Sequence, residues 1–134
     1  MEIKNYQLIG YNEILISYYE KRLPQKISYA ITKNLVVFAT EMDVYQKMLQ
    51  RILDDYKDYY IKDDAGNIKY YDSGLPMVQS DHEEEYTHRV EELLNNEIEV
   101  PIYKIDESLF SYEDSDRYDS LSAADIMRLT EVLC

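Results

Sequence analysis

The chain has 134 residues, of which 46% are hydrophobic, and a net charge of −13. The hydrophobic share excludes a chain that is disordered throughout, and the length leaves room for one core, so we expect a single domain spanning residues 1–134. The negative charge argues against direct binding of nucleic acid or of an anionic membrane, because phosphate contacts need clustered Lys and Arg.

Two helices are predicted before residue 65. Asn5 can cap the first, whose apolar residues follow at helical spacing and which ends before Pro24. No Gly or Pro interrupts residues 25–65, which permits a second helix of about 35 residues. We predict that this long helix packs antiparallel on the first one.

An apolar stripe on the long helix predicts pairing with a second copy of the chain as a coiled coil. A polar residue on such a stripe fixes the register and the number of partners at a cost in stability, and Asn34 would have this role. In the alternative, the stripe drifts and Asn34 points to solvent. The residues assigned to oligomerisation are Ile27, Ile31, Asn34, Phe38 and Tyr45.

The rest of the chain predicts shorter elements. Residues 63–67 form a turn signal, and residues 68–78 are interpreted as a short strand pair. A capping box of Ser80 and Glu83 would begin a helix that ends at residues 95–96. Residues 97–102 alternate like an edge strand, residues 106–119 form an acidic loop, and a second box at Ser122 begins the last helix. The predicted fold is therefore mainly α with a minor β part: the long helix on the N-terminal helix, edge strands, and two short C-terminal helices.

The charge of the chain changes along the sequence. Residues 1–53 carry seven Lys/Arg and five Asp/Glu, a net of +2, whereas residues 54–134 carry seven and twenty-two, a net of −15. A rigid array of carboxylates can imitate the phosphates of duplex DNA, with aromatic rings supplying the desolvated contacts. The alternative is a solvated surface that keeps a small protein soluble. The predicted partner-binding residues are Glu83, Glu84, Glu85, Tyr86, Glu91, Glu92, Glu97, Glu99, Tyr103, Asp106, Glu107 and Tyr112.

Motifs for catalysis and for metal binding are weak. Glu85 and His88 have the spacing of helical di-iron sites, but the second motif that such sites need is missing. Residues 114–119 cluster carboxylates without the glycine and the distal Glu of an EF-hand loop. No nucleophile or phosphate-loop motif occurs. We therefore predict no enzyme activity, no metal and no cofactor.

Two stretches carry a resemblance to a known family. One is Lys26–Asn34, and the other combines Tyr56, the turn at residues 64–67 and Glu92–Val100. Together they resemble a family of small uncharacterised proteins encoded by tailed phages and prophages of Gram-positive bacteria, over roughly residues 5–105. The resemblance implies a phage gene product that acts in the host cytoplasm, but it implies no activity and no site residues.

The leading hypothesis is a non-enzymatic, phage-encoded interaction protein, such as an inhibitor that binds a basic surface of a host nucleic-acid enzyme or defence protein. A homo-oligomeric structural or assembly protein of a phage is the alternative, and a metal-binding enzyme comes third. The chain has no apolar run of the roughly 18 residues that a membrane span needs, and no signal-peptide core at residues 1–5. We accordingly expect a cytoplasmic protein.

Overall fold

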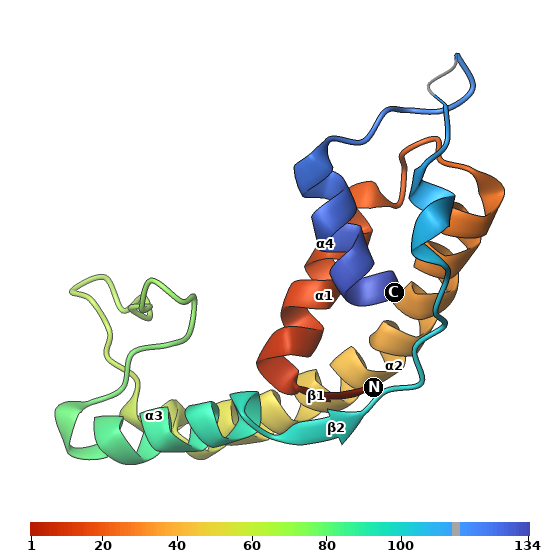
Figure 1. Cartoon of the computed structure of the whole chain (residues 1–134). Helices are drawn as coiled ribbons and strands as arrows, with labels where there is room; N and C mark the ends of the chain where they lie inside the picture. Colours follow the sequence, from red (N-terminus) through yellow and green to blue (C-terminus); the bar gives the residue numbers. More distant parts are fainter. Residues whose placement is uncertain (114–115) are drawn as a thin grey trace. The chain divides into compact units, whose positions relative to one another are not determined.

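The computed structural model describes residues 1–113 and 116–134 and is mainly helical (Figure 1). Its contacts divide the chain into two compact units. Unit 1 comprises Met1–Met42 and Glu97–Cys134, and unit 2 comprises Asp43–Asn96. The single domain predicted for residues 1–134 stays a prediction. In the described part of the chain, no helix is long and apolar enough to cross a membrane.

Helices α1 and α2 begin and end close to where the sequence predicts. Helix α1 is Asn5–Tyr18, and α2 is Gln25–Asp55 and packs on α1. The predicted cap of α1 is wrong by one residue, because Lys4 is the N-cap and its N–H donates to Oε1 of Gln7 at 2.9 Å. Pro24 stands where α2 begins, a position that needs no N–H donor, and its carbonyl accepts from the N–H of Ile27 at 3.0 Å.

Unit 1 has an aliphatic core between α1, the first part of α2 and the C-terminal helix α4, Ala123–Leu133, which lies against α1 (Figure 1). The predicted capping box of α4 is confirmed, since the N–H of Asp125 donates to Oγ of Ser122 at 3.1 Å and the N–H of Ser122 donates to Oδ2 of Asp125 at 2.9 Å. The fully buried residues of this core include Leu8, Leu15, Ile27, Ile31, Phe38, Val100, Leu129, Val132 and Leu133.

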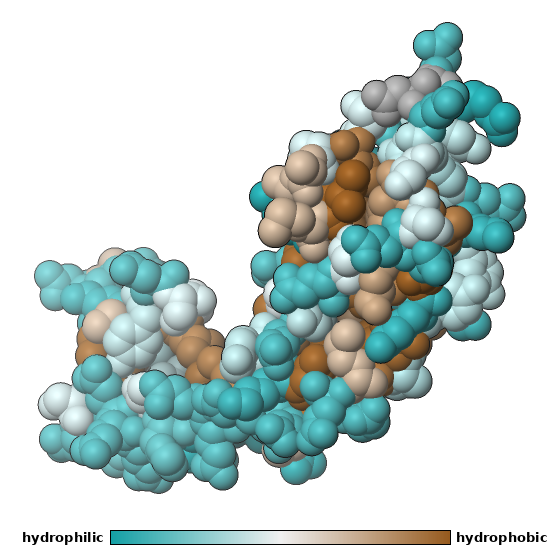
Figure 2. All heavy atoms as spheres, viewed as in Figure 1, coloured by the Kyte–Doolittle hydropathy of each residue, from teal (hydrophilic) through white to brown (hydrophobic). Residues whose placement is uncertain are grey.

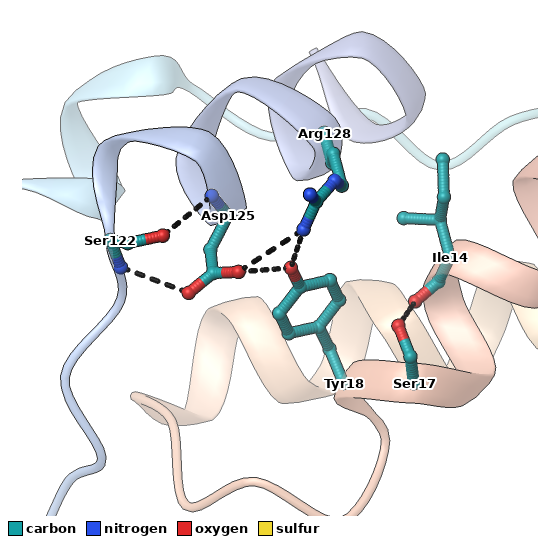
Figure 3. Close-up of polar contacts among 6 residues, drawn as sticks. All are labelled: Ile14, Ser17, Tyr18, Ser122, Asp125 and Arg128. Atoms are coloured by element: carbon teal, nitrogen blue, oxygen red, sulfur yellow. Dashed lines mark hydrogen bonds and ion pairs between the residues drawn. The ribbon is translucent and has the colours of Figure 1, made fainter.

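A polar network joins α4 to α1 at the edge of this core (Figure 3). Tyr18 is 4% exposed, and its hydroxyl donates to Oδ1 of Asp125. Nη1 of Arg128 donates to the Tyr18 hydroxyl at 3.1 Å and lies 3.5 Å from the same carboxylate oxygen. The hydrogen bond from Tyr18 is the largest cause that lowers the pKa of Asp125.

A small antiparallel sheet completes unit 1. Strand β1, Glu2–Lys4, pairs with β2, Glu97–Glu99, so that Ile3 lies opposite Ile98. The strand predicted over residues 97–102 is therefore shorter than expected. Its partner comes from the other end of the chain, and one face of the pair is buried through Ile3, which is 4% exposed.

Four of the five predicted oligomerisation residues are buried within unit 1, which corrects that prediction, and the fifth, Tyr45, belongs to unit 2. Ile27, Ile31, Asn34 and Phe38 are all less than 2% exposed, and Tyr45 is half-buried. Asn34 is neither a seam residue nor solvent-exposed. Its Nδ2 donates to the carbonyl of Tyr103 at 2.9 Å, and the N–H of Tyr103 donates to its Oδ1 at 2.8 Å. The stripe is thus covered by the chain itself.

Unit 2 is built on the second part of α2 and on α3, Ser80–Leu94, which lies along it (Figure 1). The N-cap of α3 is Gln79, so the capping box predicted at Ser80 and Glu83 is wrong by one residue. The buried residues of this core are Ile52, Tyr56, Val78, Tyr86 and Val90.

Between α2 and α3, residues 59–79 form a closed ring of backbone hydrogen bonds instead of the predicted strand pair. The N–H of Ile61 donates to Met77, that of Met77 to Lys69, and that of Lys69 to Ile61, at 2.9, 2.8 and 2.9 Å. These three residues are eight positions apart, and two turns join them. Gly66 and Gly74 occupy those turns with φ of 83° and 89°, a region that favours glycine. Only isolated bridges result, because each segment is too short for a ladder.

Candidate functional site

The solvent-facing side of α3 is the most strongly charged surface of unit 2. Six of its residues are exposed carboxylates: Asp81, Glu83, Glu84, Glu85, Glu91 and Glu92. We call them the α3 array. Figure 2 shows the corresponding region as a continuous hydrophilic surface. A shallow depression of about 540 Å³ runs along it, lined by Ser80, Glu83, Glu84, Thr87, His88 and Glu91.

Few cations neutralise the α3 array. Nε2 of His88 lies 3.9 Å from Oε2 of Glu92, and both side chains are well exposed, so solvent screens this contact. Arg89 is the one Lys or Arg of α3, and its Nη2 pairs with Oδ2 of Asp55 on α2 at 2.9 Å. The array therefore keeps nearly its whole negative charge.

The charge density of the array resembles that of a nucleic-acid strand. At 1.5 Å per residue, the twelve positions from Asp81 to Glu92 span about 17 Å, which gives roughly one carboxylate per 3 Å. One strand of duplex DNA carries one phosphate per roughly 3.4 Å of helix axis. A basic groove that accommodates a phosphate backbone would meet a similar linear density of charge on α3.

Tyr86 does not belong to this surface, which corrects a predicted partner contact. Its side chain is 1% exposed and forms an edge-to-face pair with Tyr56, with ring centroids 5.1 Å apart. Burial raises the pKa of Tyr86 to about 12. Together with Val90, it anchors α3 on α2 and so fixes the direction in which the array faces.

An aromatic stack with one exposed ring lies at the start of α3. The rings of Tyr59 and His82 lie 3.7 Å apart at an interplanar angle of 20°. Tyr59 is 37% exposed, whereas Tyr86 is not accessible. This stack was not predicted, because residues 59 and 82 are brought together only by the backbone hydrogen bonds within residues 59–79.

The remaining predicted partner-binding residues lie in unit 1, so the structure does not gather the set on one element. Glu97 and Glu99 are on β2, where Glu97 is the largest cause that raises the pKa of Glu2. Several of the others have structural contacts. Asp106 accepts from the N–H of Ser108 at 2.8 Å, and the Tyr112 hydroxyl donates to the carbonyl of Asp119 at 2.6 Å. The members in unit 1 are Glu97, Glu99, Tyr103, Asp106, Glu107 and Tyr112.

The charge change at residue 53 does not correspond to the units. Unit 1 holds eight Lys/Arg and fourteen Asp/Glu, a net of −6, and unit 2 holds six and thirteen, a net of −7. The units are thus almost equally charged, because the acidic C-terminal part of the chain folds with the basic N-terminal part. What distinguishes unit 2 is the concentration of exposed carboxylates on one helix.

Three residues of the depression, Ser80, Thr87 and His88, were not among the predicted contacts. The signal for them was available, since they recur with Glu84 and Glu91 at helical spacing along one face.

Glu85 and His88, which have the spacing of a di-iron motif, both lie exposed on α3. In the described residues, no group of three or more His, Cys, Asp or Glu could hold a metal ion, and Asp114 and Ser115 of the predicted acidic loop lie outside those residues.

No family model, no curated protein and no solved structure matches this chain.

Proposed function

We propose that this protein is a non-enzymatic interaction protein that binds a basic surface of another protein through the α3 array. The single observation that carries the proposal is the row of six exposed carboxylates on one helix. Such a row steers a cationic partner toward it and fixes the register of the contact.

The stack of Tyr59 and His82 would supply the apolar contact that charge alone does not provide. Carboxylates at an interface lose hydration, so most of the affinity of such complexes comes from a few aromatic or Arg residues. The stack has the role that the sequence analysis assigned to Tyr86. Because α3 and the stack are both held by the core of unit 2, the binding surface is preorganised.

In its finer form the proposal is a phage-encoded inhibitor, acting in the host cytoplasm as a DNA mimic on a nucleic-acid enzyme or a defence protein. The charge density of the array supports the DNA-mimic reading. The resemblance of residues 5–105 to phage proteins supports the source.

A pull-down from lysate of a Gram-positive host, at low and at moderate salt, tests the proposal. The test variant changes Glu83, Glu84 and Glu91 to Gln. The matched control changes Glu13, Glu20 and Glu113 to Gln, three exposed carboxylates of unit 1. We expect the wild type and the control to retain a nucleic-acid enzyme or defence protein in a salt-sensitive manner, and the test variant to lose it. Equal retention by all three proteins, or retention of no basic protein, would contradict the proposal.

Self-association is a second candidate, with a different surface from the predicted seam. Exposed apolar side chains occur on α1 and directly after it: Tyr6 and Ile16 are 51% and 58% exposed, and Tyr19, the C-cap, is 55% exposed. Exposed apolar side chains that lie close together can mark a surface that another protein covers. Analytical ultracentrifugation of the wild type and of Ile16→Glu decides this: dimers that the substitution dissolves support it, and a monomeric wild type at tens of micromolar removes it.

A further inference from the structure

A cavity in unit 1, separate from the α3 array, has the properties of a small-molecule site. It is open to solvent and has a volume of about 550 Å³ at the start of α2, within the range of roughly 300–1,000 Å³ that is typical of ligand pockets. Figure 1 shows the segment that follows β2 running along this part of α2. The lining residues are Pro24, Gln25, Lys26, Ile27, Tyr29, Tyr103 and Leu109.

Two tyrosines form one wall of the cavity. The rings of Tyr29 and Tyr103 meet edge to face, with centroids 5.4 Å apart and an interplanar angle of 70°. Pro24 and Leu109 add partly exposed aliphatic surface, and Ile27 beneath them is fully buried. This lining suits a flat apolar body, because an aromatic ring of a ligand can extend an edge-to-face pair.

Asn34 fixes the position of Tyr103 in this wall. Its side chain is 0% exposed and makes two hydrogen bonds to the backbone of Tyr103, at 2.8 and 2.9 Å. Tyr103 lies in a segment without regular secondary structure, and this pair of bonds fixes its backbone on α2. The cavity is therefore formed before any ligand arrives, which lowers the entropic cost of binding.

The charge at the cavity is positive, in contrast to the chain as a whole. Lys26 lines the cavity, and Nζ of Lys33 lies 4.9 Å from the Tyr103 centroid and 5.6 Å from that of Tyr29. Among the described residues, neither lysine forms an ion pair. None of the seven lining residues is acidic, although the chain has 27 Asp and Glu against 14 Lys and Arg.

We propose that this cavity binds a small organic anion with a flat aromatic body. The ring lies against Tyr29 and Tyr103, and the anionic group pairs with Lys26 at the rim, with Lys33 beside the two rings adding to the positive potential. The ligand class follows from these two features together. An apolar lining alone would accept a neutral ring, and lysines alone would attract any anion.

The test uses 2-naphthoate as the probe, with 2-naphthamide and acetate as its neutral and ring-free counterparts, followed by protein amide shifts in two-dimensional NMR. We expect saturable shifts around residues 24–29 and 103 with 2-naphthoate, at least threefold weaker binding of 2-naphthamide, and no saturation with acetate. Lys26→Gln should reduce the affinity for 2-naphthoate at least threefold without changing that for 2-naphthamide, and Tyr29→Ala should weaken both.

Both variants change exposed side chains of α2, so the fold should be retained, and the amide spectrum without ligand verifies it. Lys47→Gln is the matched control, since Lys47 is an exposed α2 lysine of unit 2. The proposal is overturned if 2-naphthoate gives no saturable shifts at millimolar concentration. It is also overturned if 2-naphthamide binds equally well, or if Lys26→Gln and Lys47→Gln have the same effect.

Discussion

The two compact units have cores of different composition. Three of the fourteen buried hydrophobic residues of unit 1 are aromatic, namely Tyr18, Phe38 and Phe110, and its buried residue Asn34 makes two hydrogen bonds to backbone. Two of the five buried residues of unit 2 are tyrosines, and the hydroxyl of Tyr86 has no hydrogen-bond partner among the described residues. Polar contacts thus fix the positions of chain segments in unit 1. The stability of the unit 2 core comes mainly from the apolar area that its aromatic rings bury.

The polar contacts of unit 1 hold separate segments together. The two hydrogen bonds of Asn34 hold the irregular segment at Tyr103, which lines the cavity, against α2, and the contact of Tyr18 with Asp125 joins α4 to α1. In unit 2 the buried rings of Tyr56 and Tyr86 pack α3 on α2, and the carboxylates of α3 stay exposed to solvent. Four substitutions, three in unit 1 and one in unit 2, should change the free energy of unfolding in different ways.

The largest effect is expected for the unit 1 core. Phe38→Ala removes a ring that is 0% exposed and should lower the free energy of unfolding by about 3–5 kcal/mol. Val36→Ala is the control, since Val36 is 66% exposed on the same helix. Urea denaturation gives the stabilities. Hydrogen exchange shows whether protection falls in unit 1 alone or in both units, and an equal loss in both would support the single domain predicted from the sequence.

The next effect concerns the tether of Tyr103. Asn34→Leu leaves the N–H and the carbonyl of Tyr103 without their partners, so we expect a loss of about 2 kcal/mol in the free energy of unfolding. At a coiled-coil seam the same substitution would raise stability and loosen the oligomeric state. A urea midpoint above that of the wild type would therefore contradict the structural role of Asn34.

A pH-dependent effect is expected where α4 joins α1. The pKa of Asp125 is lowered in the folded state, first by the hydrogen bond from Tyr18, so its contribution to stability is present above the unfolded pKa of about 3.9 and is lost as the pH falls through the folded pKa. Asp125→Asn should be less stable than the wild type at pH 7, and the difference should shrink toward pH 2–3. Urea midpoints across this range measure it, and a difference independent of pH would rule out the carboxylate as its cause.

The smallest effect is expected in the unit 2 core, with the opposite sign. Tyr86→Phe removes a buried hydroxyl without a partner among the described residues, so it should raise stability by up to about 1 kcal/mol. The raised pKa of about 12 means that the wild type loses stability as the pH rises above the unfolded pKa of about 10, which the Phe variant avoids. The advantage of Phe should thus grow between pH 10 and pH 12, and a destabilised variant at pH 8 would indicate an unrecognised partner.

Local patterns in the sequence predicted the helices, because a helix is specified by residues three and four positions apart. The stretch from residue 25 without Gly or Pro gave α2, and Ser122 with Asp125 gave the start of α4. The boundary at Ser80 failed by one residue, since Gln79 and Ser80 both precede the same apolar pattern. Five of the six carboxylates of the α3 array, all except Asp81, were among the predicted contacts, and all six are exposed.

Contacts between distant residues could not be read from the sequence. An apolar stripe that includes Asn34 looks the same in the sequence whether a second copy or the chain itself covers it, and the hydrogen bonds between Asn34 and the backbone of Tyr103 distinguish the two. The partner of β2 lies 95 residues away, as Ile3 opposite Ile98 shows.

The sequence by itself determined a mainly helical, strongly acidic chain and one helix that is rich in exposed carboxylates, because helical spacing and charge are local properties. Only the tertiary structure decided that the acidic C-terminal part folds with the N-terminal part, which turns a net of +2 and −15 along the sequence into −6 and −7 in space. It also decided that Tyr29 and Tyr103 form one wall of a cavity and that Tyr86 is an anchor instead of a contact. The physical reason is that burial depends on which surfaces cover each other, and a single sequence encodes that only through the whole fold.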